Sequence, residues 1–247
     1  MRLNRYLAAA GLGSRRGVEE LIAGHKVRIN GKVIESLSTQ VEPGDTVVVG
    51  GRVLKAEPPI YAVLNKPPGY MVTAHDERGR HTIYELLPPE WPRTFYVGRL
   101  DKMSEGLIIL TNDGPFGYAL AHPSHKVEKE YEVMLDKDFE PAHAAKLIKG
   151  FRIEGGRAKM EKVEMRGPKF IRVTLTQGIK RQIRVMLYAL GYEVEVLRRI
   201  RIGPLWLGRM RAGEWRRLAP KEVKELRPAG MAMKAVKGAK PVVEEEE

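Results

Sequence analysis

Residues 97–114 read VGRLDKMSEGLIILTNDG, and they decide how the larger part of the chain folds. Within them, residues 107–111 form a short apolar run rich in aliphatic side chains, which predicts a strand in the interior of a sheet. Asn112-Asp113-Gly114 is a turn signal that ends this strand, and Gly106 interrupts any helix before it. Asp101 therefore lies in a loop that leads straight into a buried strand, a position that suits chemistry better than packing.

The same stretch resembles the catalytic motif of pseudouridine synthases, in particular the type that acts on ribosomal RNA. That motif carries GRLD, a hydroxyl residue three positions on, a glycine, an aliphatic run and TNDG. Ser104 stands where the family usually has Thr, and either side chain supplies one hydroxyl group. The alternative, in which Asp101 merely caps a turn, does not explain why the resemblance recurs along nearly the whole chain.

The charge of the chain indicates a polyanionic partner. The sequence has 43 lysines and arginines against 31 acidic residues, a formal net charge of +12. The excess gathers in two clusters, so we expect a polyanion held at two places with an affinity that falls steeply with salt. A basic surface without such a role is the alternative. The clusters are Arg2, Arg5, Arg15, Arg16, Lys26, Arg28 and Lys32, and then Lys180, Arg181, Arg184, Arg198, Arg199, Arg201, Arg209, Arg211, Arg216 and Arg217.

Several kinds of site are missing from the sequence. The chain has no cysteine and thus no disulfide, thiolate nucleophile or Cys-bound metal, which fits a reducing cytoplasm. No apolar run approaches the ~18 to 20 residues of a membrane span, and MRLNRYLAAAGLGSRR lacks the apolar core of a secretory signal. There is no P-loop, no GxGxxG after a strand and no HExxH, and the histidines of HPSH at 122–125 are poorly spaced for a metal. We therefore expect no cofactor, no metal and no membrane contact.

Residues 1–57 predict a small separate module. Ser14 is expected to cap its second helix and Gly24 to end it, and Asn30-Gly31 signals a tight hairpin. The order of helix pair, basic residues and hairpin resembles the αL RNA-binding module, which holds structured RNA by its phosphates. A small α/β fold with ordinary surface charge is the alternative. The expected elements are helices over 2–10 and 14–23, hairpin strands over 26–29 and 32–34, and a strand over 46–49.

A second domain is expected over residues 61–229, after a stiff linker at Glu57-Pro58-Pro59. Residues 231–247 are rich in Ala, Lys, Gly and Pro and end in glutamates, which predicts a disordered tail. Strands outnumber helices and mostly lack the spacing of βαβ units, so we expect an α+β domain with a mixed, largely antiparallel sheet. The expected strands cover 60–64, 107–111, 129–135, 170–176 and 195–202, and NKPPG at 65–69 resembles a turn of the same family.

The clearest helix is predicted over residues 181–190, RQIRVMLYAL. Its apolar residues fall on one face, and Gly191 follows as a terminator. The stretch QGIKRQIRVM resembles a second family motif, which commonly reads EGRNRQIRRM; this chain departs from it at Gln177, Ile179, Lys180 and Val185. A solvated basic face over an apolar stripe is the alternative, and it leaves the two arginines that flank Gln-Ile unexplained.

The resemblance implies a reaction and the residues that perform it. A pseudouridine synthase breaks the bond between the ribose anomeric carbon and the uracil nitrogen, turns the base and rejoins it through ring carbon 5. An ionised carboxylate suits this step as nucleophile or base, and a guanidinium partner lowers the pKa of an aspartate by roughly 1 to 3 units. By correspondence, Asp101 is the catalytic carboxylate, Arg184 is its ion-pair partner, and Tyr131 stacks on the flipped-out uracil. Arg181 is expected to face the RNA backbone, and Arg99 to reach into the RNA where the base has left.

We therefore expect an RNA pseudouridine synthase that isomerises one uridine of ribosomal RNA as a cytoplasmic monomer. LRRIRIGPLWLGRMRAGEWRRL at 197–218 is closer to the large-subunit branch of the family, which favours 23S over 16S rRNA. The alternative from another class is a non-catalytic RNA-binding or ribosome-assembly factor on the same fold. Nuclease-like hydrolysis lacks the carboxylate cluster that metal-assisted cleavage uses. In the N-terminal module, the residues expected to bind RNA are Arg5, Arg15, Arg16, Lys26, Arg28 and Lys32.

Overall fold

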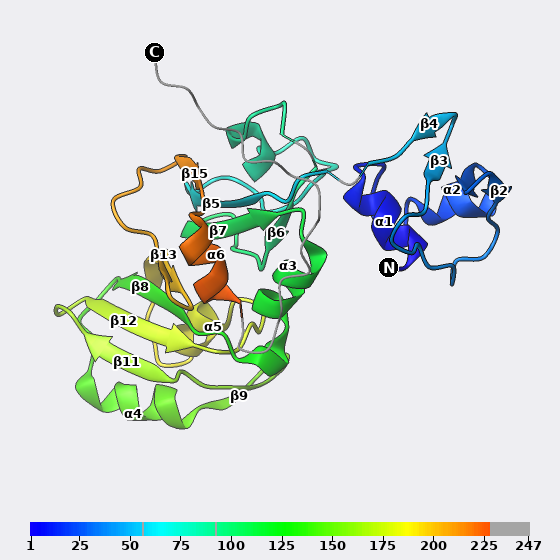
Figure 1. Cartoon of the computed structure of the whole chain (residues 1–247). Helices are drawn as coiled ribbons and strands as arrows, with labels where there is room; N and C mark the ends of the chain where they lie inside the picture. Colours follow the sequence, from blue (N-terminus) through cyan, green and yellow to red (C-terminus); the bar gives the residue numbers. More distant parts are fainter. Residues whose placement is uncertain (56, 92, 228–247) are drawn as a thin grey trace, which may run out of the picture. The chain divides into compact units, whose positions relative to one another are not determined.

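The structure is a computed structural model that describes residues 1–55, 57–91 and 93–227. The chain divides between Pro59 and Ile60 into two compact units (Figure 1). The expected tail over 231–247 and the expected end of the second domain at 229 lie outside the described residues.

The first unit combines two short helices with a four-stranded antiparallel sheet in the order β2-β1-β3-β4. Apolar side chains of both helices and of the central strands share one buried core, which includes Leu7, Ile22 and Val47. Asn30 and Gly31 have φ of 50° and 83°, as a primed hairpin turn requires. The elements are α1 (Leu3–Ala9), α2 (Glu19–Ala23), β1 (Val27–Ile29), β2 (Lys32–Val33), β3 (Val47–Val49) and β4 (Arg52–Val53).

The second helix of this unit is shorter than predicted. It begins at Glu19 and not at Ser14, because residues 15–18 form turns in its place. Ser14 still caps these turns, since its hydroxyl accepts a hydrogen bond from the backbone N–H of Gly17 at 2.9 Å. The strand β4 was not predicted, because two residues are too few for an alternating pattern to appear.

The second unit is built on a nine-stranded mixed sheet in the order β11-β12-β8-β13-β7-β5-β15, with β6 on β7 and β14 on β13. Only β13 and β7 run parallel, which confirms the expected α+β fold with a largely antiparallel sheet. The strands are β5 (Tyr61–Lys66), β6 (Phe95–Val97), β7 (Glu105–Thr111), β8 (Lys129–Leu135), β11 (Lys162–Met165), β12 (Phe170–Leu175), β13 (Val194–Ile202), β14 (Leu205–Trp206) and β15 (Trp215–Arg217), with a separate pair β9 (Phe151–Ile153) and β10 (Gly156–Ala158).

The strand β7 is buried on both faces. Leu107 and Ile109 belong to one core cluster, and Ile108 and Leu110 belong to another. The predicted interior strand is therefore present, and the loop that contains Asp101 leads into the central part of the sheet. The helices of this unit are α3 (Gly114–Ala121), which packs on β6 and β7, α4 (Pro141–Lys149) beside β11, α5 (Gln182–Tyr188) beside β13 and α6 (Pro220–Leu226), with short 3₁₀ helices at Ile83–Leu86 and Pro123–His125.

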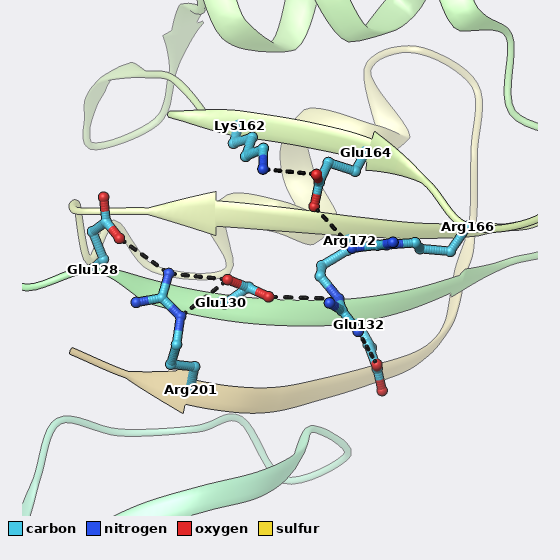
Figure 2. Close-up of polar contacts among 8 residues, drawn as sticks. All are labelled: Glu128, Glu130, Glu132, Lys162, Glu164, Arg166, Arg172 and Arg201. Carbon is cyan, nitrogen blue, oxygen red and sulfur yellow. Dashed lines mark hydrogen bonds and ion pairs between the residues drawn. The ribbon is translucent and has the colours of Figure 1, made fainter. Parts of the chain in front are cut away.

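Paired charges cross one face of the sheet from β11 to β13 (Figure 2). Glu164 accepts from Lys162 at 2.7 Å and from Arg166 at 3.3 Å, and Arg201 lies 2.9 Å from Glu130. We call this set the charge ladder, and its members are Glu128, Glu130, Glu132, Lys162, Glu164, Arg166, Arg172 and Arg201.

Candidate active site

Asp101 lies in the loop between β6 and β7. The backbone N–H of Ser104 donates to the Asp101 carbonyl at 3.1 Å, so the loop closes as a turn around the aspartate. The Asp101 side chain is 35% exposed, and its carboxylate accepts no hydrogen bond from the described residues. The carboxylate is therefore open to a ligand from the solvent side.

Gly106 sets where this loop meets the sheet. Its φ is 103°, a region that L side chains rarely adopt, and a Cβ atom there would overlap the backbone of Arg199 in β13. Gly106 is one of the two residues through which β7 pairs in parallel with β13, and it lies opposite Arg199. A glycine is thus required for the loop and β13 to approach so closely.

Lys66 fixes the backbone of this loop through hydrogen bonds. This lysine ends β5 and is fully buried, and its ammonium donates to the carbonyls of Lys102 at 2.9 Å, Ser104 at 2.7 Å and Pro67 at 2.9 Å. Burial lowers the pKa of Lys66 to about 8, and the nearby Glu105 and Asp101 carboxylates oppose that shift. The ammonium fixes the backbone on the C-terminal side of Asp101 and places a positive charge near the carboxylate.

Arg199 holds both ends of the loop. It is 3% exposed, and its Nε donates to the Leu107 carbonyl at 2.7 Å while Nη1 donates to the Arg99 carbonyl at 3.4 Å. Its Nη2 is buried and has no partner among the described residues. Two buried cations therefore bind backbone carbonyls on both sides of Asp101.

The two predicted arginines of α5 lie near Asp101, but not in the expected arrangement. The Nη1 of Arg181 lies 4.0 Å from an Asp101 carboxylate oxygen, and Arg181 caps the helix in the left-handed conformation, with φ of 54°. Arg184 donates to the carbonyl of Val194 at 2.7 Å and makes no ion pair with Asp101 within 4.0 Å. Burial and then Arg181 lower the pKa of Arg184, while Asp101 raises it. The ion pair expected of Arg184 is thus made by Arg181.

A pair of amides holds the loop before α5. Gln182 is buried and donates to the Lys159 carbonyl at 2.9 Å and to Gln177 Oε1 at 3.0 Å. The same Gln177 oxygen accepts from the backbone N–H of Lys159 at 3.0 Å. These bonds tie the turn that carries Arg181 to a distant segment, which explains why this turn keeps its left-handed residue.

Tyr131 lies in β8 between two core clusters. It is partly buried and packs against the cluster that contains Ile183 and the cluster that contains Leu100, the neighbour of Asp101. In the sheet it is paired with Arg199 of β13. Tyr131 thus lies where the Asp101 loop and α5 approach the same part of the sheet.

Lys66, Arg199 and Gln182 are parts of this site that were not predicted from the sequence. The available signals were a lysine at the end of a buried strand, in NKPPG, and Arg199 in the strand at 194–202, where Arg198 and Arg201 are also present. Neither signal states which loop the cation would hold. Arg99 is exposed and offers only its carbonyl to Arg199, so its side chain is open to a ligand.

The basic clusters differ in how their charges are used. In the second cluster, Arg201 and Arg216 form ion pairs with carboxylates, at 2.9 Å to Glu130 and 2.7 Å to Glu222, so part of the positive charge expected of this cluster is neutralised within the chain. In the first unit, the six expected RNA-binding residues are exposed and make no ion pair within the described chain: Arg5, Arg15, Arg16, Lys26, Arg28 and Lys32.

No group of three His, Cys, Asp or Glu side chains that would hold a metal occurs within 1–55, 57–91 and 93–227. Among the same residues, no helix has the length and apolar character of a bilayer-spanning segment.

Comparison with known proteins defines the class. Residues 60–189 match the RNA pseudouridylate synthase family and residues 1–47 match the S4 domain. The chain belongs to the RNA pseudouridine synthase family and carries an S4 domain at its N-terminus. It is therefore an enzyme of the isomerase class that acts on RNA.

Individual relatives cover nearly the whole chain. The "Ribosomal large subunit pseudouridine synthase B" of Bacillus subtilis is 36% identical over 92% of this chain and 95% of its own length. The "Dual-specificity RNA pseudouridine synthase RluF" of Escherichia coli is 38% identical over 92% of this chain and 78% of its own. A crystal structure of a pseudouridylate synthase, 29% identical, superimposes with a TM-score of 0.68 over 92% of this chain and 99% of that one.

Proposed function

We propose that this enzyme isomerises a specific uridine of large-subunit ribosomal RNA and that Asp101 is its catalytic carboxylate. The observation that carries the proposal is the state of Asp101: its loop is fixed by the buried Lys66 and Arg199, yet its carboxylate accepts no hydrogen bond from the described residues. A carboxylate that is held in place but accepts no hydrogen bond from its own chain is suited to act on a substrate.

The carboxylate acts at the sugar. It attacks the anomeric carbon or takes a proton from the ribose while the bond to the uracil nitrogen breaks; both routes end with a new bond to ring carbon 5 and a proton moved from that carbon to the nitrogen. Arg181 lies 4.0 Å from the Asp101 carboxylate, and Arg184 and Lys66 add positive charge nearby, which would attract the phosphates of an RNA substrate to the site.

The base must leave its stack in the RNA to reach Asp101. Unstacking costs a few kcal/mol, and an aromatic face returns roughly 1 to 3 kcal/mol per base. Tyr131 supplies that face in this proposal, and Arg99, exposed at the loop, occupies the space that the base leaves. The S4 domain holds the RNA by its phosphates through its exposed basic residues.

The target is assigned to the large subunit from the chain's similarity to the Bacillus subtilis relative and from the stretch 197–218. We also propose that the reaction takes place in the cytoplasm and that the enzyme is a monomer. Size-exclusion chromatography of the purified protein tests the oligomeric state.

Mapping of pseudouridine tests the function. Ribosomal RNA from cells that lack the protein is treated with carbodiimide, before and after the cells receive the wild-type gene or its Asp101→Ala variant. We expect one large-subunit position to lose its pseudouridine and to regain it only with the wild type. If the wild type restored pseudouridine at a small-subunit position, the target would be small-subunit RNA. Unchanged pseudouridine at every position would indicate the non-catalytic assembly factor.

A further inference from the structure

Two cations and the proposed stacking tyrosine share one face of the sheet. In β8, Lys129 and Tyr131 are two residues apart, so their side chains lie on the same face, about 7 Å apart along the strand. The antiparallel partner β13 places Arg199 opposite Tyr131 and Ile202 opposite Lys129. Lys129 and Arg199 are therefore diagonal neighbours beside Tyr131.

Neither cation has a carboxylate partner among the described residues. Arg199 is 3% exposed, binds two backbone carbonyls and leaves Nη2 buried without a partner. Lys129 is partly buried and makes no hydrogen bond or ion pair with the described residues. Burial and the neighbouring Arg199 together lower the pKa of Lys129 to about 8. Two like charges are thus kept close together in a poorly hydrated place.

On the opposite face of the same strands, the cations do have carboxylate partners. Glu130 lies between Lys129 and Tyr131 in β8, and its carboxylate points to the other face, where Arg201 and Arg172 lie within 3.5 Å of it (Figure 2). The chain supplies carboxylates to the cations of the charge ladder but none to Lys129 and Arg199. An anion from outside the chain would compensate these two charges.

We propose that Lys129 and Arg199 form an anion site for one phosphate of the RNA, the phosphate attached to the nucleotide whose base stacks on Tyr131. The partly exposed Lys129 ammonium makes the contact, and the buried Arg199 adds its field. The spacing of Lys129 and Tyr131 along β8 is comparable to the span of a single nucleotide from phosphate to base. The inference rests on the proposed function, because it requires a nucleotide of RNA to enter the site.

A binding role and a purely structural role differ in what the removal of Lys129 does to stability. An uncompensated, partly buried ammonium opposes folding, so Lys129→Met is expected to raise the melting temperature while it weakens RNA binding. A lysine that served only the fold would lower the melting temperature on the same substitution. Lys129→Arg keeps the charge and is expected to restore most of the affinity.

The test uses an RNA stem-loop that contains the uridine found by mapping, bound to the full chain in an Asp101→Asn background that prevents turnover. We expect Lys129→Met to weaken binding about tenfold and to lower the salt slope by about one phosphate contact. The matched control is Lys162→Met, which removes a lysine paired with Glu164 on the opposite face and should leave the affinity within about twofold.

A second arm removes the charge from the RNA. In two versions of the stem-loop, the phosphate on one or the other side of the uridine is a neutral methylphosphonate. One version is expected to bind the Asp101→Asn protein about tenfold more weakly and to bind the protein that also carries Lys129→Met no more weakly than the unmodified RNA. Unchanged affinity of Lys129→Met, or equal sensitivity of both proteins to the neutral phosphate, would overturn the anion site. Failure of the wild type to form pseudouridine in any rRNA would instead refute the proposed function.

Discussion

The two faces of one sheet use their charges in opposite ways. On the charge ladder, the cations of β11, β12 and β13 lie 2.7 to 3.5 Å from carboxylates of the same chain (Figure 2). Around Asp101, the shortest distance from a cation to the carboxylate is 4.0 Å, from Arg181. The other cations there, Lys66, Arg184 and Arg199, donate to backbone carbonyls.

The difference separates charges that serve the fold from charges kept for a ligand. The ladder combines four carboxylates with four cations, so it projects little net field and its ion pairs are internal to the protein. The region around Asp101 keeps a surplus of positive charge, which burial makes unfavourable and which a polyanion would neutralise. Variants on the two faces are therefore expected to fail in different assays.

Apart from substitutions of Asp101, the largest loss of catalytic rate is expected for Gly106→Ala. A methyl group there overlaps the backbone of Arg199 and must adopt φ of 103°, so the loop moves away from β13. We expect the single-turnover rate of pseudouridine formation to fall by at least about a hundredfold. Gly208→Ala is the control, because Gly208 has φ of 62° but open space around it. A folded Gly106→Ala protein with the wild-type rate would contradict the proposed role of the loop.

Lys66→Met is expected to lower the single-turnover rate by about 10- to 100-fold, with RNA affinity changed less than about threefold. The substitution leaves the carbonyls of Pro67, Lys102 and Ser104 without their donor, so the backbone beside Asp101 is no longer fixed. Rates at saturating RNA and binding by filter retention separate the two effects. If affinity and not rate were lost, Lys66 would serve RNA binding, and its proposed role of fixing the Asp101 loop would be wrong.

Substitutions of Arg181 and Arg184, at the start of α5, are expected to differ in their effects on rate and on RNA affinity. Arg184 is half-buried and held by the Val194 carbonyl, so Arg184→Met should lower the rate about tenfold or more and change affinity little. Arg181 is 52% exposed and close to Asp101, so Arg181→Met should weaken RNA binding as well as the rate. The reverse pattern would assign the RNA contact to Arg184.

Alkaline pH offers a smaller perturbation of the same region. Below pH 8 the Lys66 ammonium donates to three carbonyls, and above it the neutral amine has only two N–H groups, so the rate should decline severalfold between pH 7.5 and 9.5. The ordinary pKa of lysine is 10.5, so between pH 8 and 10.5 the unfolded chain binds more protons and the contribution of Lys66 to the free energy of unfolding rises with pH. Lys129 titrates in the same range, so Lys66→Met and Lys129→Met are measured beside the wild type.

The smallest effect on activity is expected on the ladder. Arg172→Met leaves Glu130 and Glu132, which are 12% and 26% exposed, without a shared partner. Removal of one partner of a largely buried ion pair is destabilising, so the melting temperature should fall by several degrees. The single-turnover rate at a temperature where the protein is folded should stay within about twofold. A large loss of rate would show that the two faces are not independent.

Much of the fold follows from local pattern. The strands β8 and β12 show the alternation of a half-buried strand, β7 shows the continuous apolar run of a strand buried on both faces, and Asn30-Gly31 fixes the first hairpin. The helix α3 could not be predicted in this way, because GPFGYALA contains two glycines and a proline. It forms because Asp113 caps it and because Phe116 and Leu120 pack in the core with β7.

The site was predictable in its parts but not in its contacts. Asp101, Tyr131 and the α5 arginines are readable from local motifs. Which arginine approaches Asp101 depends on the left-handed backbone of Arg181 and on amide bonds to Lys159, a residue from another segment. The buried cations reach the Asp101 loop from β5 and β13, and no local pattern records such distant pairings.

The central claim is that Asp101 supplies chemistry and that the cations around it supply the binding and the rigid frame. Single-turnover formation of pseudouridine in the mapped stem-loop is measured for Asp101→Asn and for Asp138→Asn, an exposed aspartate with no ion pair or hydrogen bond among the described residues. We predict that Asp101→Asn binds the RNA within about threefold of the wild type and loses more than about a thousandfold in rate, while Asp138→Asn keeps both. A measurable wild-type rate in Asp101→Asn would contradict the account.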